Sequence, residues 1–263
     1  MTSPHSRAWL TGVLVVALAG LSLGFAASAL ADTSARVGAA PSPALQAALR
    51  DYDAQRLGAA RRAFERLARA GDAVAQYNLA VMHLRGELPQ PDMARAVRLL
   101  EQAASAGLVT AQFTLGQLYD GSRLGRPDPA RALAWYHRAA EAGSIDAQVE
   151  VATAYYLGRG VTADAATAAS WYRQAATAGD EAAQYLLASM YEHGLGLTAD
   201  ARLAHYWYEM AGRNGDVAAE AKARVMARQM ADEAAKDLAD EQTRADRPGS
   251  ASALAPAPPA SSP

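Results

Sequence analysis

The sequence predicts an all-α protein built from stacked pairs of antiparallel helices. A period of 36 residues runs through the chain and is marked by Gly71, Gly107, Gly143, Gly179 and Gly215. Within each period, small and apolar residues recur every three or four positions, which places them on one face of a helix. A single helical hairpin cannot bury such a face alone, so we expect neighbouring hairpins to stack and to share one continuous core.

The first half of each period predicts one helix with an apolar stripe. Alanine stands four residues after each marker glycine, an apolar residue eight residues after it, and tyrosine or histidine twelve residues after it. Offsets of 4, 8 and 12 form one stripe on a helix. The residues at offset 8 are Leu79, Leu115, Val151 and Leu187, and those at offset 12 are His83, Tyr119, Tyr155 and Tyr191.

The second half of each period predicts another helix, which begins at an aspartate. We expect Asp92, Asp128, Asp164 and Asp200 to cap these helices, because a carboxylate there accepts backbone N–H bonds and faces the positive end of the helix dipole. The alternative is a row of metal-binding or catalytic acids. An aromatic pair follows in three periods, as Trp135-Tyr136, Trp171-Tyr172 and Trp207-Tyr208.

These aromatic pairs have alanines around them at helical spacing, so we expect them to pack in the core. Their tyrosine hydroxyls are expected to reach the surface more than their tryptophan rings. The alternative is a sugar-binding platform. The turn between the two helices carries Gly86, Gly158 with Gly160, or Gly194 with Gly196, which allow the positive φ of a tight reversal. These turns lack the Lys-Ser/Thr of a phosphate loop.

The combined pattern, Ala-x-x-x-Leu-x-x-x-Tyr, Gly-x-Gly, Asp, then Ala-x-x-Trp-Tyr-x-x-Ala-Ala-x-x-Gly, resembles the Sel1-like repeat, a relative of the tetratricopeptide repeat. The units 143–178 and 179–214 match best, and 71–106 departs most because it has Leu99-Leu100 in place of Trp-Tyr. The resemblance implies a right-handed α-solenoid of stacked antiparallel helical hairpins, with atypical caps at its ends.

The chain outside the clear units supplies these caps and the terminal segments. Ala60 and the stretch from Phe64 to Ala68 echo the second helix of a unit, and Val217 to Met230 keep helical spacing before the sequence becomes polar. The predicted organisation is a signal peptide at 1–31, a linker at 32–41, a divergent hairpin at 42–70, repeats at 71–106, 107–142, 143–178 and 179–214, a capping helix at 215–243, and a disordered Pro/Ala/Ser tail at 244–263.

Residues 1–31 have the three parts of an export signal. Arg7 supplies a positive charge, the stretch from Trp9 to Phe25 is almost continuously apolar, and Ala29-Leu30-Ala31 offers a cleavage site. We therefore expect cleavage after Ala31 and a periplasmic or secreted chain without stable membrane insertion. The alternative is an uncleaved anchor, because the apolar stretch approaches the length of a spanning helix. The chain has no cysteine, which excludes a lipoprotein, a disulfide and a thiolate site.

Composition and motifs argue against several functions. A formal net charge of −2 does not favour nucleic-acid binding. His83, His137, His193 and His205 do not form a His-Glu-x-x-His or similar ligand pair, and the chain has no Gly-x-Ser-x-Gly nucleophile motif. We expect no catalytic residues, no metal and no cofactor, and hence a protein that is not an enzyme.

The resemblance places the function on the first helices of successive hairpins, which in this family line a concave groove that binds a protein or peptide. It implies an adaptor, scaffold or regulator in the cell envelope. The alternative is a peptidoglycan-associated wall factor or a hydrolase-like enzyme, and the chain is expected to be a monomer or a weak homo-oligomer. The groove positions, at offsets 6, 10 and 13, are Tyr77, Phe113, Gln117, Asp120, Thr153, Tyr156, Tyr185, Ser189 and Glu192.

Overall fold

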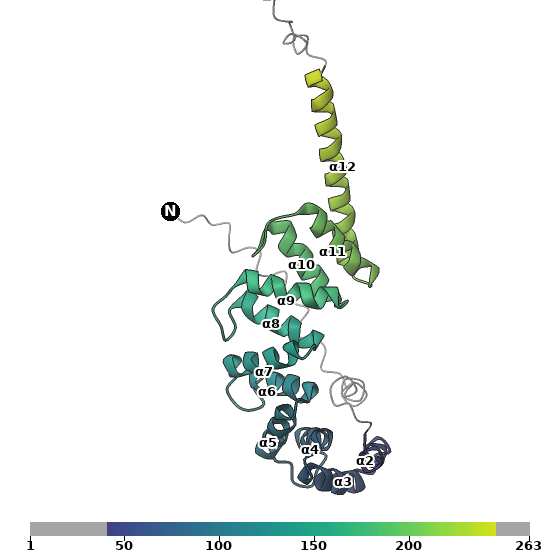
Figure 1. The fold of residues 1–263 in the computed structure, drawn as a ribbon, viewed down its shortest axis with the longest axis vertical. Helices are drawn as coiled ribbons and strands as arrows, with labels where there is room; N and C mark the ends of the chain where they lie inside the picture. Colours follow the sequence, from purple (N-terminus) through teal and green to yellow (C-terminus); the bar gives the residue numbers. More distant parts are fainter. Residues whose placement is uncertain (1–40, 246–263) are drawn as a thin grey trace, which may run out of the picture. The chain divides into compact units, whose positions relative to one another are not determined.

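The computed structural model describes residues 41–245, which form eleven α-helices and contain no strand (Figure 1). The predicted signal and all but the first two residues of the predicted tail lie outside this range. The chain divides into two compact units, residues 1–110 and 111–263, with α6 (Val109–Asp120) running across the boundary. In each unit, helices that follow one another in sequence pack side by side as antiparallel hairpins. The predicted all-α fold of stacked hairpins is confirmed.

The first unit contains two hairpins. They are formed by α2 (Pro43–Asp53), α3 (Leu57–Arg69), α4 (Ala73–Arg85) and α5 (Met93–Ser105). The fully buried side chains of Phe64 and Leu79 lie at the centre of its core, and the ring of Tyr52 meets Phe64 edge-on with centroids 6.2 Å apart. The divergent segment before Gly71 therefore supplies a complete hairpin to this core.

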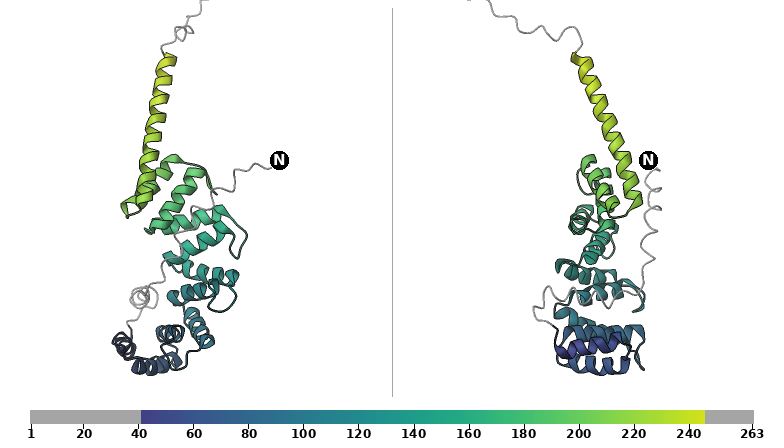
Figure 2. Two further views of the ribbon diagram at one scale, coloured as in Figure 1. Left: turned by 180° about the vertical axis from the view of Figure 1, so that it is seen from behind. Right: turned by 90° about the vertical axis from the view of Figure 1, so that its right-hand side faces the viewer.

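The second unit, taken by itself, is built of helices packed in the same way (Figure 2). Small alanines let its helices approach closely, while Leu187 and Tyr208 fill the space between them. Its helices are α7 (Pro129–Glu141), α8 (Ile145–Leu157), α9 (Ala165–Thr177), α10 (Glu181–His193), α11 (Ala201–Arg213) and α12 (Val217–Ala245).

The last helix, α12, covers the end of the second unit with only its first part. Ala219, Ala223 and Met226 are buried against the preceding helices, whereas every residue from Ala231 to Arg244 is exposed. The polar sequence of the second half needs no apolar partner. The helix begins after Asp216, whose carboxylate accepts the backbone N–H of Ala219 at 3.0 Å.

The recurring aspartates cap the second helices, as predicted. The Oδ1 atoms of Asp92 and Asp128 accept backbone N–H bonds from the residues three positions on, at 2.9 and 3.0 Å. Asp164 and Asp200 each accept two such bonds. The first helices are capped as well, which the sequence analysis had not predicted. Their capping residues are Asp72, Ser144 and Asp180.

The turn glycines adopt the expected left-handed conformation. Gly158 and Gly194 end α8 and α10 with φ of 71° and 66°. The second glycine of each turn has a further reason for its identity, because it lies against the start of the second helix of the preceding hairpin. A Cβ on Gly160 would come within 2.5 Å of the carbonyl carbon of Pro129, and one on Gly196 would collide with the backbone of Ala165.

Candidate functional site

The tyrosines of the second helices reach through the core to the polar surface of the first helices. Tyr136, Tyr172 and Tyr208 are 4%, 2% and 1% exposed. The hydroxyl oxygens of Tyr172 and Thr153 on α8 form a hydrogen bond of 2.9 Å, and Tyr208 donates to Glu192 Oε2 on α10 at 2.7 Å. The rings thus pack in the core, as predicted, while their hydroxyls contact the side chains of the first helices.

The tryptophans of the same pairs are half-buried, so they are more exposed than the tyrosines, contrary to the expectation from the sequence. Trp171 lies 5.6 Å from the ring of His137, edge to face, and the guanidinium of Arg138 stacks 4.6 Å from the ring of Trp135. These contacts use the tryptophan faces within the protein. They favour a packing role over a sugar-binding platform.

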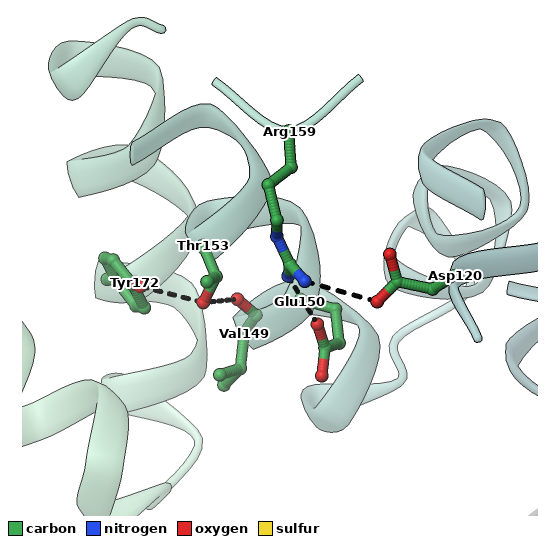
Figure 3. A network of polar contacts seen from close by, with 6 residues as sticks. All are labelled: Asp120, Val149, Glu150, Thr153, Arg159 and Tyr172. Atoms are coloured by element: carbon green, nitrogen blue, oxygen red, sulfur yellow. Dashed lines mark hydrogen bonds and ion pairs between the residues drawn. The ribbon is translucent and has the colours of Figure 1, made fainter. Parts of the chain in front are cut away.

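Two carboxylates and one guanidinium form a cluster on the first helices of the second unit (Figure 3). Arg159 extends from the turn after α8, and Nη1 donates to Asp120 Oδ2 on α6 at 3.2 Å while Nη2 donates to Glu150 Oε2 on α8 at 3.2 Å. We call Asp120, Glu150 and Arg159 the Asp120–Glu150 cluster. It holds two acids and one base, which gives it a formal charge of −1.

The position of Tyr136 on α7 depends on a glycine of α6. Its ring packs so closely on α6 that a Cβ at Gly116 would collide with it. The other first helices carry Ala80, Ala152 and Ala188 at the same offset. Phe113 covers the Tyr136 ring with centroids 5.5 Å apart. Within residues 41–245, the Tyr136 hydroxyl has no hydrogen-bond partner, unlike those of Tyr172 and Tyr208.

The pKa values in the cluster follow from burial and from its surplus of negative charge. Burial raises the pKa of Glu150, Asp120 adds to the rise, and Arg159 offsets only part of it. Burial also raises the pKa of Tyr136, and the charges of Glu150 and Asp120 raise it further. Burial raises the pKa of Tyr172 to about 12, although the bond with Thr153 opposes the shift. The charge balance itself follows from the residues: two carboxylates share one guanidinium.

Glu192, in the last hairpin, has a contrasting environment. Lys222 Nζ from α12 donates to both of its carboxylate oxygens, at 2.9 and 3.1 Å, in addition to the bond from Tyr208. Burial acts to raise the pKa of Glu192, but the Tyr208 and Lys222 bonds outweigh it and lower the pKa overall. This carboxylate is fully paired within the chain, and the Asp120–Glu150 cluster is not.

Eight of the nine predicted groove residues lie on the first helices of the second unit. Gln117 on α6 and Tyr156 on α8 are exposed, and Tyr156 keeps 39% of its surface accessible. The half-buried members are Phe113, Asp120, Thr153, Tyr185, Ser189 and Glu192. We call the exposed and polar side chains of α6, α8 and α10 in this unit the first-helix surface. Tyr77 lies in the first unit and is only 3% exposed, so it is not part of this surface.

The sequence analysis missed Glu150, Arg159 and Lys222. Glu150 stands at offset 7 rather than at an expected groove offset, and Arg159 was interpreted only as the middle of a glycine turn. Both belong to the cluster because of contacts across nine and 39 positions of the chain. The repeated glycine turn was the available signal, since it recurs with arginine in one unit and leucine in the next.

Residues 41–245 offer neither a cluster of metal ligands nor a membrane-spanning helix. The part of the chain from 41 to 245 contains no group of three or more side chains able to hold a metal ion. The histidines have structural contacts: Nδ1 of the buried His83 accepts the backbone N–H of Asp92 at 3.1 Å, and His137 meets Tyr155 and Trp171 edge-on. None of the described helices combines the length and apolarity needed to cross a membrane.

Comparison with known families identifies the repeat. The Sel1 repeat family model matches residues 73–108, 109–144, 145–180 and 181–216, which together exceed half of the chain. The chain therefore belongs to the Sel1 repeat family, and the suggested resemblance is confirmed. Each match starts within two residues of the predicted marker glycines. Sel1 repeats generally act as non-catalytic scaffolds for protein–protein interaction.

Two solved structures are similar in sequence and fold. One is a protective antigen of uropathogenic Escherichia coli strains with an SLR fold, at 32% identity and a TM-score of 0.60, covering 63% of this chain and 35% of that one. The other is a Sel1 repeat protein from Oxalobacter formigenes, at 34% identity and a TM-score of 0.53, covering 61% of this chain and 65% of that one. The chain thus spans about a third and just under two thirds of these relatives. A search of curated proteins gives no match.

Proposed function

We propose that this chain is a non-enzymatic adaptor, scaffold or regulator of the cell envelope that binds an extended segment of another protein on its first-helix surface. The observation that carries the proposal is that exposed Gln117 and Tyr156 lie on α6 and α8, the same two helices that hold the carboxylates of the incompletely paired Asp120–Glu150 cluster. An aromatic ring can anchor a partner, and amide and carboxylate groups can hydrogen-bond its backbone and side chains.

The envelope location rests on the signal-like pattern of residues 1–31. It makes a prediction that is separate from the binding site. The full-length chain produced in a Gram-negative host should appear in the periplasm or medium, with Asp32 as its first residue. An intact amino terminus in a membrane fraction would instead indicate a retained anchor.

The binding proposal is tested by crosslinking in cells and affinity purification, followed by mass spectrometry. A variant with Gln117→Ala and Tyr156→Ala should lose the partner, because both side chains are exposed and their removal leaves the core intact. The matched control is Leu238→Ala, which removes an apolar side chain that is 61% exposed on α12. This control should retain the partner, and all three proteins should melt at similar temperatures.

The same experiment separates the adaptor from the alternative of a wall-associated factor. A protein partner that is retained by Leu238→Ala and lost from the Gln117/Tyr156 variant supports the adaptor. Recovery of wall fragments, with co-sedimentation of the purified protein with sacculi and competition by muropeptides, would support peptidoglycan binding. If the two variants capture the same proteins as the wild type, the first-helix surface is not the binding site.

A further inference from the structure

We infer that the Asp120–Glu150 cluster, together with the Tyr136 hydroxyl, binds a cationic side chain, arginine or lysine, of the protein segment that occupies the first-helix surface. This inference rests on the proposed function and specifies the chemistry of the partner. Three observations support it: carboxylate oxygens that have no hydrogen-bond partner, a tyrosine hydroxyl that has none either, and an arginine that already shows how a cation is held there.

Each carboxylate of the cluster accepts hydrogen bonds with only one of its two oxygens. Arg159 bonds one oxygen of each, Asp120 Oδ2 and Glu150 Oε2, and among the described residues Asp120 Oδ1 and Glu150 Oε1 have no hydrogen-bond partner. Ion pairs and charge-assisted hydrogen bonds are strongest where burial limits competition from water. Both side chains are partly buried, with 27% and 36% of their surfaces exposed. A second cation can therefore reach them and be held there.

The hydroxyl of Tyr136 supplies the third polar group. Tyr136 is 4% exposed, and the charges of Glu150 and Asp120 both add to the rise in its pKa that burial causes. Among residues 41–245 this hydroxyl has no hydrogen-bond partner, whereas the equivalent hydroxyls of Tyr172 and Tyr208 are both paired. The exception occurs in the hairpin where Gly116 lets the ring settle on α6. A bound donor that meets the carboxylates also satisfies this hydroxyl as an acceptor.

The last hairpin shows what the complete arrangement looks like. There, Glu192 receives one bond from Tyr208 and two from Lys222, so a tyrosine, a carboxylate and a cation satisfy one another. The Asp120–Glu150 cluster has the tyrosine and two carboxylates but only one cation. The partner's side chain takes the place that Lys222 takes in the last hairpin.

Substitution of Arg159 should change the affinity for a cationic segment and for an anionic ligand in opposite directions. A partner cation must enter beside the Arg159 guanidinium, which repels it and competes for the same carboxylates. Replacing Arg159 with glutamine should therefore strengthen the binding of a cationic segment. An anionic ligand would instead use Arg159 as its contact, and the same substitution would weaken its binding.

The experiment selects peptides from a displayed random 12-residue library on the purified mature chain and measures their affinity by fluorescence polarisation. We expect the selected peptides to share an arginine or lysine whose replacement with glutamine weakens binding at least tenfold. Asp120→Asn combined with Glu150→Gln should remove that difference. Arg159→Gln should increase affinity severalfold. The matched control is Glu209→Gln, which alters a carboxylate paired with Arg213 on α11, outside the first-helix surface, and should leave the preference unchanged.

The outcomes separate this inference from the proposed function. Suppose that the selected peptides bind and that the Gln117/Tyr156 variant binds them more weakly. If these peptides then show no preference for a cationic residue, or if that preference survives the Asp120/Glu150 double substitution, the inference is wrong and the proposed surface stands. Weaker binding in Arg159→Gln would also overturn it. If no selected peptide depends on the first-helix surface, both are overturned. Circular dichroism and melting of each variant exclude loss of fold as the cause.

Discussion

The hydrogen bond between Asn214 and Gln184 leads to a stability prediction that can be worked through in full. Gln184 is 2% exposed, and its Nε2 donates to the carbonyl of Ala176 at 3.1 Å. Its Oε1 accepts from Asn214 Nδ2 at 3.0 Å, so both ends of the buried amide are paired. Replacing Asn214 with alanine leaves the buried acceptor without a partner.

The expected cost of Asn214→Ala is about 1 to 2 kcal/mol. A buried acceptor that loses its partner costs about 1–3 kcal/mol, and the lower part of this range applies because Asn214 is exposed and water can partly replace it. Each kcal/mol lowers the melting temperature of a domain of this size by about 2–4 °C. Urea denaturation and calorimetry measure both quantities. The control is the same substitution in a Gln184→Met background, where no acceptor remains and Asn214→Ala should have almost no effect.

The preceding hairpin permits the reverse experiment. Gln148 occupies the same offset as Gln184, but its buried Oε1 has no partner among the described residues. Ala178 stands where Asn214 stands in the next unit, and both end a helix with the same backbone, at φ −77° and ψ −2° against φ −84° and ψ −3°. Ala178→Asn should therefore stabilise the chain by about 0.5–1.5 kcal/mol.

Ala178→Ser is the control, because its hydroxyl is too short to reach Gln148. If Ala178→Asn is no more stable than Ala178→Ser, and Asn214→Ala unfolds at the same urea concentration as the wild type, pairing of the repeated glutamine does not contribute to stability. The reasoning from buried acceptors would then be refuted for this fold.

Three further predictions concern other recurring positions. Gly196→Ala should destabilise the chain by about 2–5 kcal/mol, because a Cβ there collides with the backbone of Ala165 and the left-handed conformation is strained for alanine. Gly179 also has a positive φ but faces open space, so Gly179→Ala should cost only the strain, about 1–2 kcal/mol. Urea denaturation measures both changes. Tyr208→Phe should cost about 1.5–3 kcal/mol because it removes a bond to a carboxylate, whereas Tyr136→Phe, which removes a hydroxyl without a partner, should be neutral or slightly stabilising. Burial lowers the pKa of His83 in the folded chain below the 6.5 of a free histidine. The neutral His83 side chain therefore contributes its full stability above pH 6.5, and this contribution is lost as the pH falls through the folded pKa. In His83→Gln, the free energy of unfolding should depend less on pH between about pH 7.5 and 5.

The contrary outcomes are equally specific. Equal losses for Gly196→Ala and Gly179→Ala would show that the close approach of the hairpins relaxes without cost. Equal losses for Tyr208→Phe and Tyr136→Phe would mean that the Tyr136 hydroxyl is paired in solution. An unchanged pH profile in His83→Gln would place the acid sensitivity of the chain on other groups.

The fold was predictable because its determinants are local and repeat. An aspartate that caps a helix and a glycine that ends one act within a few residues, and four copies of the pattern confirm one another. The contacts between hairpins were not predictable in the same way. Gly160 and Gly196 look like ordinary turn residues, and only the packed structure shows that each also makes room for the backbone of the preceding hairpin.

The candidate site was predicted only in part, for a related physical reason. The offsets of the first helices selected Gln117 and Tyr156, and both are exposed, because exposure on a repeated helix follows from its periodicity. They could not identify the cluster, because Arg159 reaches Asp120 across 39 positions and its role depends on the direction of one long side chain. The repeated glutamines at offset 5 were visible in the sequence, but their hydrogen bonds to the preceding helix required the structure.

The departures from the repeat carry the argument for function. A residue that recurs in every unit serves the packing that every unit shares, so recurrence favours a structural role. Gly116 replaces the alanine of the other units, Arg159 occupies a turn position that is leucine in the next unit, and Lys222 lies on the capping helix outside the repeats. Gly116 gives the Tyr136 ring room on α6, Arg159 pairs one oxygen each of Asp120 and Glu150, and Lys222 completes the pairing of Glu192. A regular scaffold thus presents one irregular site, and that site is where a specific partner would be distinguished from others.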